Sequence, residues 1–87
     1  MFAEDVLRKY YWQAGREVFN ELQIFYISRG GDGVIQGSDV ETMGKLGLEL
    51  HGGSIIPYHR IIKIELHGMV VFDRYDERRK ARERKNI

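Results

Sequence analysis

The 87-residue sequence contains no cysteine, and this absence excludes disulfide bonds, thiol catalysis and thiolate metal sites. It also contains no apolar run near the roughly 20 residues that a membrane-spanning helix needs. The first eight residues carry acids where a secretory signal peptide carries bases. From these absences we expect a soluble, cytoplasmic protein with no membrane partner.

The apolar residues that are present suffice for one small core. Hydrophobic residues make up 43% of the chain and aromatic residues 11%. This composition suits a compact domain, and 87 residues are too few for two domains. We therefore predict a single domain over residues 1–74.

Charge is distributed unevenly, although the formal net charge is only +1. Residues 1–73 carry seven Lys/Arg and ten Asp/Glu, whereas residues 74–87 carry seven and three. Between residues 75 and 86 the only apolar side chains are Tyr75 and Ala81, so this segment cannot bury a face. We predict that residues 75–87 form a basic tail, as a frayed helix or a disordered segment, and that attraction to polyanions comes mainly from it.

The beginning of the chain predicts one helix followed by one strand. Apolar residues recur at helical spacing over residues 2–13, and Gly15 is the expected end of the helix. Residues 22–29 have the composition of a strand with apolar side chains on both faces. We expect this strand to be covered on both sides, with the helix as one of the two covers.

Turn signals divide the rest of the chain. Gly30–Gly33 has turn chemistry, and Gly52–Gly53 and His67–Gly68 are hairpin signals between apolar segments. Pro57 cannot donate a hydrogen bond to a strand ladder. We therefore expect residues 57–60 to form a short turn that redirects the chain into the next strand.

Short extended segments are predicted between these turns, at residues 34–40, 46–50, 54–56, 62–66 and 69–72. Leu46, Leu48 and Leu50 alternate with other residues, so they should share the apolar face of one strand. The predicted fold class is α+β, in which an N-terminal helix packs on a bent antiparallel sheet or small barrel of five to six short strands.

The most informative segment reads Ile-Pro-Tyr-His-Arg-Ile at residues 56–61. Further matching segments are Tyr11–Trp12, Tyr26–Gly30, Gly37–Val40 and Val70–Phe72. With these segments the chain, from about residue 5 to residue 74, resembles a family of small, mostly archaeal uncharacterised proteins. That family is also described as the RNA cyclic-group-end recognition domain. The resemblance implies binding of RNA ends that bear a cyclic phosphate.

The side chains in this segment suit a phosphate ligand. Arg60 offers a planar fork of donors for two phosphate oxygens, and His59 can donate one further hydrogen bond. A 2′,3′-cyclic phosphate is a monoanion with two free oxygens, so these donors nearly exhaust its acceptors. Tyr58 could stack on the terminal base. Arg29, which precedes a glycine turn, and Ser38 complete the predicted set of RNA-binding residues.

Structural roles for the same residues remain open at this point. His59 could cap a corner of the fold by hydrogen-bonding a carbonyl, Tyr58 could belong to the core, and Ser38 could be a turn or cap hydroxyl. Arg60 could form a structural ion pair with one of three carboxylates: Asp39, Glu65 or Asp73.

The sequence argues against an enzyme. None of the three histidines, His51, His59 and His67, is followed two residues later by Ser or Thr, as in two-histidine phosphoesterases. Gly30–Gly33 matches neither a P-loop nor a dinucleotide-binding fingerprint. We predict no catalytic residue, no metal and no cofactor.

The function predicted from the sequence is a non-catalytic RNA-binding module that recognises single-stranded RNA ends with a terminal cyclic phosphate. RNA-processing enzymes and a second copy of the chain are further candidate partners. The alternatives are a protein-interaction or dimerisation module, built on a patch of Tyr10, Tyr11 and Trp12, and an accessory subunit of an RNA-end processing enzyme.

Overall fold

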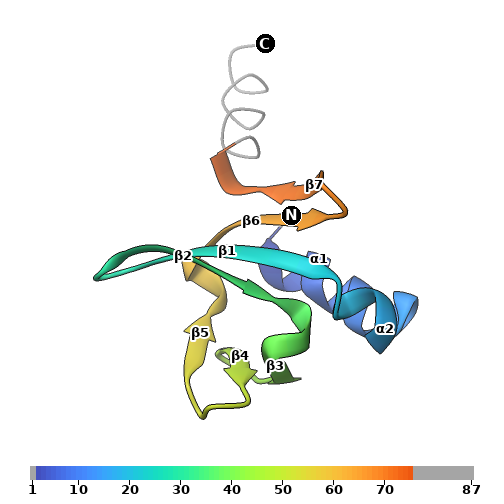
Figure 1. Ribbon diagram of the computed structural model, residues 1–87, viewed down its shortest axis with the longest axis horizontal. Helices are drawn as coiled ribbons and strands as arrows, with labels where there is room; N and C mark the ends of the chain where they lie inside the picture. Colours follow the sequence, from blue (N-terminus) through green and yellow to red (C-terminus); the bar gives the residue numbers. More distant parts are fainter. Residues whose placement is uncertain (1, 76–87) are drawn as a thin grey trace.

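The computed structural model describes residues 2–75 of the chain, and these residues form an α+β fold (Figure 1). The helical elements are α1 (Ala3–Lys9), a π-helical turn (Tyr10–Ala14) and α2 (Arg16–Phe19). The strands are β1 (Leu22–Ser28), β2 (Gly31–Gln36), β3 (Val40–Met43), β4 (Gly47–Leu50), β5 (Ile55–Pro57), β6 (Ile61–Leu66) and β7 (Met69–Asp73). Apart from Tyr75, the predicted basic tail lies outside the described residues.

The predicted N-terminal helix is confirmed. Its first turn is capped by the Asp5 carboxylate, which accepts a hydrogen bond from the backbone N–H of Phe2 at 3.2 Å. The helix continues through the π-helical turn and ends at Gly15, whose φ of +96° is a conformation that side-chain-bearing residues rarely adopt. The short α2 follows directly, and the hydrophobic spacing did not predict it.

The strands form two antiparallel sheets instead of one bent sheet or a barrel. The first has the order β2-β1-β6-β7 and the second the order β3-β4-β5. The described residues contain seven strands, more than the predicted five to six. The reason is local, because the expected extended segment at residues 34–40 is broken by a 3-10 turn at Gly37–Asp39. This turn moves the chain from the first sheet to the second.

One hydrophobic core joins both sheets and both helices. Leu7 of α1, Phe19 of α2, Ile24 of β1, Leu48 of β4 and Ile64 of β6 are each fully buried in this one cluster. The helices and the three-stranded sheet therefore contribute to the same interior as one face of the four-stranded sheet. Burial of this shared apolar surface is the main favourable term in the stability of such a domain.

The expectation that β1 is covered on both sides is wrong. Leu22 and Ile24 point into the core, whereas Phe25, on the opposite face, is half-buried and Ile27 is exposed. The prediction for the strand at residues 46–50 also needs a correction: Leu48 is buried, but Leu46 precedes β4 and is 77% exposed.

The predicted turn at His67–Gly68 is confirmed, whereas the turn predicted at Gly30–Gly33 lies at Arg29–Gly30, because Gly31–Gly33 already belong to β2. His67 and Gly68 have φ values of 52° and 81° and join β6 to β7. Gly52 and Gly53 lie in the β4–β5 hairpin, but its loop spans residues 51–54 instead of the predicted two residues, and the Leu50 N–H donates to the Ser54 carbonyl at 2.8 Å. Among residues 2–75 there is no helix with the length and apolar character needed to cross a bilayer.

Candidate functional site

The segment Tyr58–Arg60 forms a 3-10 turn, here called the η3 turn, between β5 and β6. Pro57 ends β5 with φ −60° and ψ 141°, an extended conformation compatible with its ring. The ladder of the three-stranded sheet stops there, since Pro57 pairs with Gly47 as the last residue of β5. The predicted redirecting turn is therefore confirmed, and it carries the Tyr-His-Arg part of the motif.

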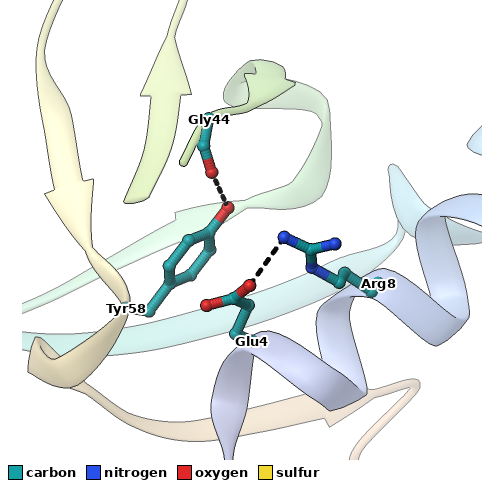
Figure 2. Close-up of polar contacts among 4 residues, drawn as sticks. All are labelled: Glu4, Arg8, Gly44 and Tyr58. Atoms are coloured by element: carbon teal, nitrogen blue, oxygen red, sulfur yellow. Dashed lines mark hydrogen bonds and ion pairs between the residues drawn. The ribbon is translucent and has the colours of Figure 1, made fainter. Parts of the chain in front are cut away.

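Tyr58 fixes the η3 turn to the rest of the molecule. Its side chain is 9% exposed, and its hydroxyl donates a hydrogen bond of 2.5 Å to the carbonyl oxygen of Gly44 (Figure 2). Its backbone N–H donates to the Leu46 carbonyl at 3.3 Å. This burial favours the core role that the sequence left open for Tyr58.

The surroundings of the Tyr58 hydroxyl keep it neutral. Burial raises the pKa of the Tyr58 hydroxyl, and the charge of Glu4 raises it further. The Arg8 guanidinium, which forms a 2.7 Å ion pair with Glu4, acts in the opposite direction (Figure 2). A neutral phenol can donate its proton to the Gly44 carbonyl, so the link between the turn and the β3–β4 loop persists at neutral pH.

His59 and Arg60 are presented at the surface next to a third base. His59 is exposed and Arg60 is half-buried. The Arg74 guanidinium donates a hydrogen bond of 2.7 Å from Nη1 to the backbone carbonyl oxygen of His59. The turn therefore carries one imidazole and one guanidinium group, and the Arg74 guanidinium binds its backbone.

Two of the three carboxylates considered as structural partners of Arg60, Glu65 and Asp39, have other partners. Glu65 pairs with Lys63 at 3.2 Å, and the Asp39 carboxylate accepts a hydrogen bond from the backbone N–H of Gln36 at 2.9 Å. Within residues 2–75, Arg60 makes no hydrogen bond or ion pair of its own. Its donors are therefore available to a ligand as far as the described part of the chain is concerned.

Arg74 was not among the residues predicted from the sequence, although a signal for it existed. The His67–Gly68 turn sets the β6–β7 register, in which Leu66 pairs with Met69 and Lys63 with Asp73. Continuing that register by one residue places Arg74 beside the first residues of β6. Hairpin register could thus have located this side chain.

The other two predicted site residues lie at opposite ends of β1. Tyr26 pairs with Gly33 on one side and with Ile61 on the other, so Arg29, beyond Tyr26, lies at the same end of the sheet as the η3 turn. Ser38 follows β2 at the end where Gln36 pairs with Gln23. The fold places Arg29 at the same end of the sheet as Arg60 and Ser38 at the opposite end.

A family model described as the MJ1316 RNA cyclic group end recognition domain matches residues 1–74. The chain belongs to this family. A UPF0248 protein of Pyrobaculum aerophilum is 38% identical over 73 residues, which cover 68% of this chain and 96% of the relative. A UPF0248 protein of Archaeoglobus fulgidus is 35% identical over 57 residues, which cover 64% of this chain and 83% of the relative. No solved structure matches the chain.

In this member of the RNA cyclic group end recognition family, the three histidines lie in three separate turns and loops. His67 contacts Glu21 at 2.8 Å in the β6–β7 turn, at the other end of β6 from His59. His51 lies in the β4–β5 loop, where its backbone N–H donates to the Asp39 carbonyl at 3.2 Å. Residues 2–75 contain no group of three or more His, Asp or Glu side chains that could hold a metal ion.

Proposed function

We propose that this protein binds RNA ends and that the η3 turn holds the terminal phosphate. The observation that carries the proposal is the hydrogen bond from Arg74 to the His59 carbonyl, which brings a guanidinium to the backbone of the turn that carries His59 and Arg60. The description of the family as an RNA cyclic group end recognition domain supports the same ligand class.

The chemistry of the η3 turn matches an anion that only accepts hydrogen bonds. Guanidinium groups offer paired donors that fit two phosphate oxygens, and an imidazole adds one further donor. In this proposal Arg60 binds the two free oxygens of a 2′,3′-cyclic phosphate, while His59 and Arg74 complete the donor set. Arg29 lies at the same end of the sheet and would bind the preceding phosphate.

Tyr58 takes a different role from the stacking role considered for it. Its buried ring and its bond to Gly44 hold the η3 turn in place. We therefore assign it as a positioning residue, whose contribution is to keep His59 and Arg60 in one fixed arrangement.

The proposed module binds without catalysing a reaction. Cleavage or opening of a phosphodiester by side chains needs two proton-transfer groups near one phosphorus. His59 lies in the η3 turn, whereas His51 and His67 lie in other loops. Cytoplasmic enzymes that produce or consume cyclic phosphate ends would be its functional partners, and the module would supply their recognition of the end.

The decisive experiment is a titration with three single-stranded RNAs of one sequence that end in a 2′,3′-cyclic phosphate, a 3′-phosphate or a 3′-hydroxyl. Arg60→Lys keeps the charge but loses the planar fork, so it should weaken binding of the cyclic end about 5- to 100-fold. His59→Ala and Arg74→Gln should act in the same direction. Lys9→Gln, which removes an exposed cation of α1, is the control and should leave the ratio between ends unchanged.

Melting temperatures of the same variants separate a binding role from a structural one. Unchanged melting temperatures together with a reduced preference for the cyclic end support the proposal. A wild-type protein without any preference among the three ends would refute it, and so would variants that melt earlier but keep the full preference.

One observation favours a protein-interaction module as the second candidate. Trp12 is 74% exposed at the end of the N-terminal helix, while Tyr10 and Tyr11 are half-buried and pack against the core. If the protein self-associates and Trp12→Ala abolishes that association, while all three RNAs bind equally, the interaction module becomes the better description.

A further inference from the structure

The four-stranded sheet has one face that no described element covers. On β1, Phe25 and Ile27 alternate with the core residues, so they lie on this outer face. Val34 of β2 is 55% exposed, Val70 of β7 is 50% exposed, and neither belongs to the core cluster. The outer face is thus an apolar surface in the part of the chain that the structure describes.

Phe25 lies at the centre of this face with a cation over its ring. Its neighbours across the sheet are Val34 on β2 and Lys63 on β6, and side chains opposite each other in a ladder share one face. The Lys63 ammonium lies 4.5 Å from the centroid of the Phe25 ring. Lys63 also pairs with Glu65 at 3.2 Å, so the cation is held at the ring by two neighbours.

This aromatic position is continuous with the η3 turn. Lys63 is the third residue after Arg60, which immediately precedes β6, so their Cα atoms are at most about 10 Å apart. A nucleotide whose phosphate is held at Arg60 can therefore extend its base, or that of its neighbour, toward the Phe25 ring.

We propose that Phe25 and Lys63 form a stacking position for a nucleobase next to the bound phosphate of single-stranded RNA. This inference rests on the proposed function. An aromatic ring on an open sheet accepts any base, because every base has a flat π-face. When the base takes the place of the Lys63 ammonium over the ring, Lys63 keeps its ion pair with Glu65 beside the base.

The acids around the face disfavour a symmetric dimer with a second copy of the chain. Asp32 lies opposite Ile27, and Asp73 lies opposite Lys63, so acids border the apolar centre on two sides together with Glu65. A symmetric dimer through this face would bring the acids of one copy close to those of the other, which is unfavourable. An RNA strand can place uncharged bases at the centre and its phosphates at the basic end of the sheet.

The test compares two pentanucleotides with the same 2′,3′-cyclic phosphate end, one with all its bases and one with abasic riboses at the last two positions. The wild type should bind the complete oligomer about tenfold more tightly. Phe25→Leu removes the ring but keeps an apolar side chain, and it should bind the two oligomers about equally. Trp12→Leu, which removes an exposed aromatic residue away from the sheet, is the control and should behave as the wild type.

A second variant keeps the test valid if Phe25→Leu does not fold. Val34→Glu places a negative charge opposite Phe25 at a surface position of an edge strand, and it should weaken the complete oligomer more than the abasic one. If both variants keep the tenfold base dependence, the inference is overturned. The inference is also overturned if the wild type self-associates and the two variants lose only that concentration-dependent self-association, because the face is then a dimer interface.

The preference for the cyclic end over the hydroxyl end is measured in parallel on Phe25→Leu. If that preference is retained while the base dependence is lost, both proposals stand. If the wild type shows no preference among ends, the phosphate site fails, and the comparison of the two oligomers still decides the role of Phe25.

Discussion

The hydroxyl of Tyr58 donates a 2.5 Å hydrogen bond to the carbonyl oxygen of Gly44, fourteen residues earlier in the chain. This bond joins the η3 turn, which carries His59 and Arg60, to the β3–β4 loop of the second sheet. The ring also lies beside the Glu4–Arg8 ion pair of α1 (Figure 2). One side chain thus ties the basic turn to the helix and to the three-stranded sheet.

Tyr58→Phe should therefore destabilise the protein by about 1–2 kcal/mol. The ring is kept, so the cost is the lost hydrogen bond and the unpaired carbonyl of Gly44. Urea unfolding, with the midpoint and slope compared between the two proteins, measures this value. A loss below about 0.3 kcal/mol would mean that water replaces the hydroxyl without cost and that the bond does not hold the turn.

The advantage of Tyr58 over phenylalanine should depend on pH. Because burial and Glu4 raise the pKa of Tyr58 in the folded state, the unfolded chain loses this proton first as the pH rises. The stability difference between wild type and Tyr58→Phe should be constant below about pH 10 and should shrink above it. Unfolding free energies at pH 8, 9, 10 and 10.5 test this, and an advantage that grows with pH would contradict the assignment.

Local signals in the sequence predicted the N-terminal helix and the turns at residues 57–60 and 67–68 correctly, but not the turn at Gly30–Gly33, most of which belongs to β2. Pro57 restricts the backbone by its ring, and Gly15 and Gly68 permit positive φ values because they lack a Cβ atom, so these effects do not depend on distant parts of the chain. The family resemblance likewise rests on a short segment at residues 56–61, and it is confirmed over residues 1–74.

Features that depend on tertiary arrangement could not be predicted in the same way. The apolar residues Phe25 and Ile27 indicated a strand covered on both sides, but composition does not show how many layers a small chain can supply. With α1, α2 and the second sheet all in one core, no described element remains for the outer face. Arg74 was missed because it joins the site through the register of a hairpin and a single hydrogen bond to His59.

Gly37 is required by a close approach of two backbone segments. A Cβ atom added to Gly37 would lie 1.7 Å from the Phe19 carbonyl oxygen and 2.6 Å from its carbonyl carbon. Neither group can move without shifting α2, so Gly37→Ala should destabilise the protein by about 1–3 kcal/mol or more.

Gly30→Ala is the matched control, because a Cβ atom there would have no heavy atom within 4 Å. It should change stability by less than about 0.5 kcal/mol. Thermal or urea unfolding of both variants decides the matter, and equal effects at the two positions would show that α2 does not pack closely against the 3-10 turn at Gly37–Asp39.

Two leucines separated by one residue give a sharp test of strand facing. Leu48→Ala should cost about 2–4 kcal/mol, because Leu48 is fully buried in the core. Ile64→Ala should cost a similar amount for the same reason. Leu46→Ala, at an exposed position, should cost less than about 0.5 kcal/mol. Similar losses for Leu46 and Leu48 in urea unfolding would mean that the facing of this segment is wrong.

The last prediction separates the basic tail from the η3 turn. Deleting residues 76–87 removes six Lys/Arg but leaves His59, Arg60 and Arg74 in place. If the tail binds RNA phosphates, the slope of log affinity against log salt should fall by about 0.7 for each phosphate that the tail neutralises.

The truncation should weaken all RNA sequences about equally, because binding to phosphates carries no base information. The ratio of affinities for cyclic and hydroxyl ends should stay at its wild-type value, since the side chains proposed to read the end are retained. A truncated protein that keeps its salt slope would show that the tail binds no phosphate. A truncated protein without the end preference would move the recognition of the phosphate from the η3 turn to the tail.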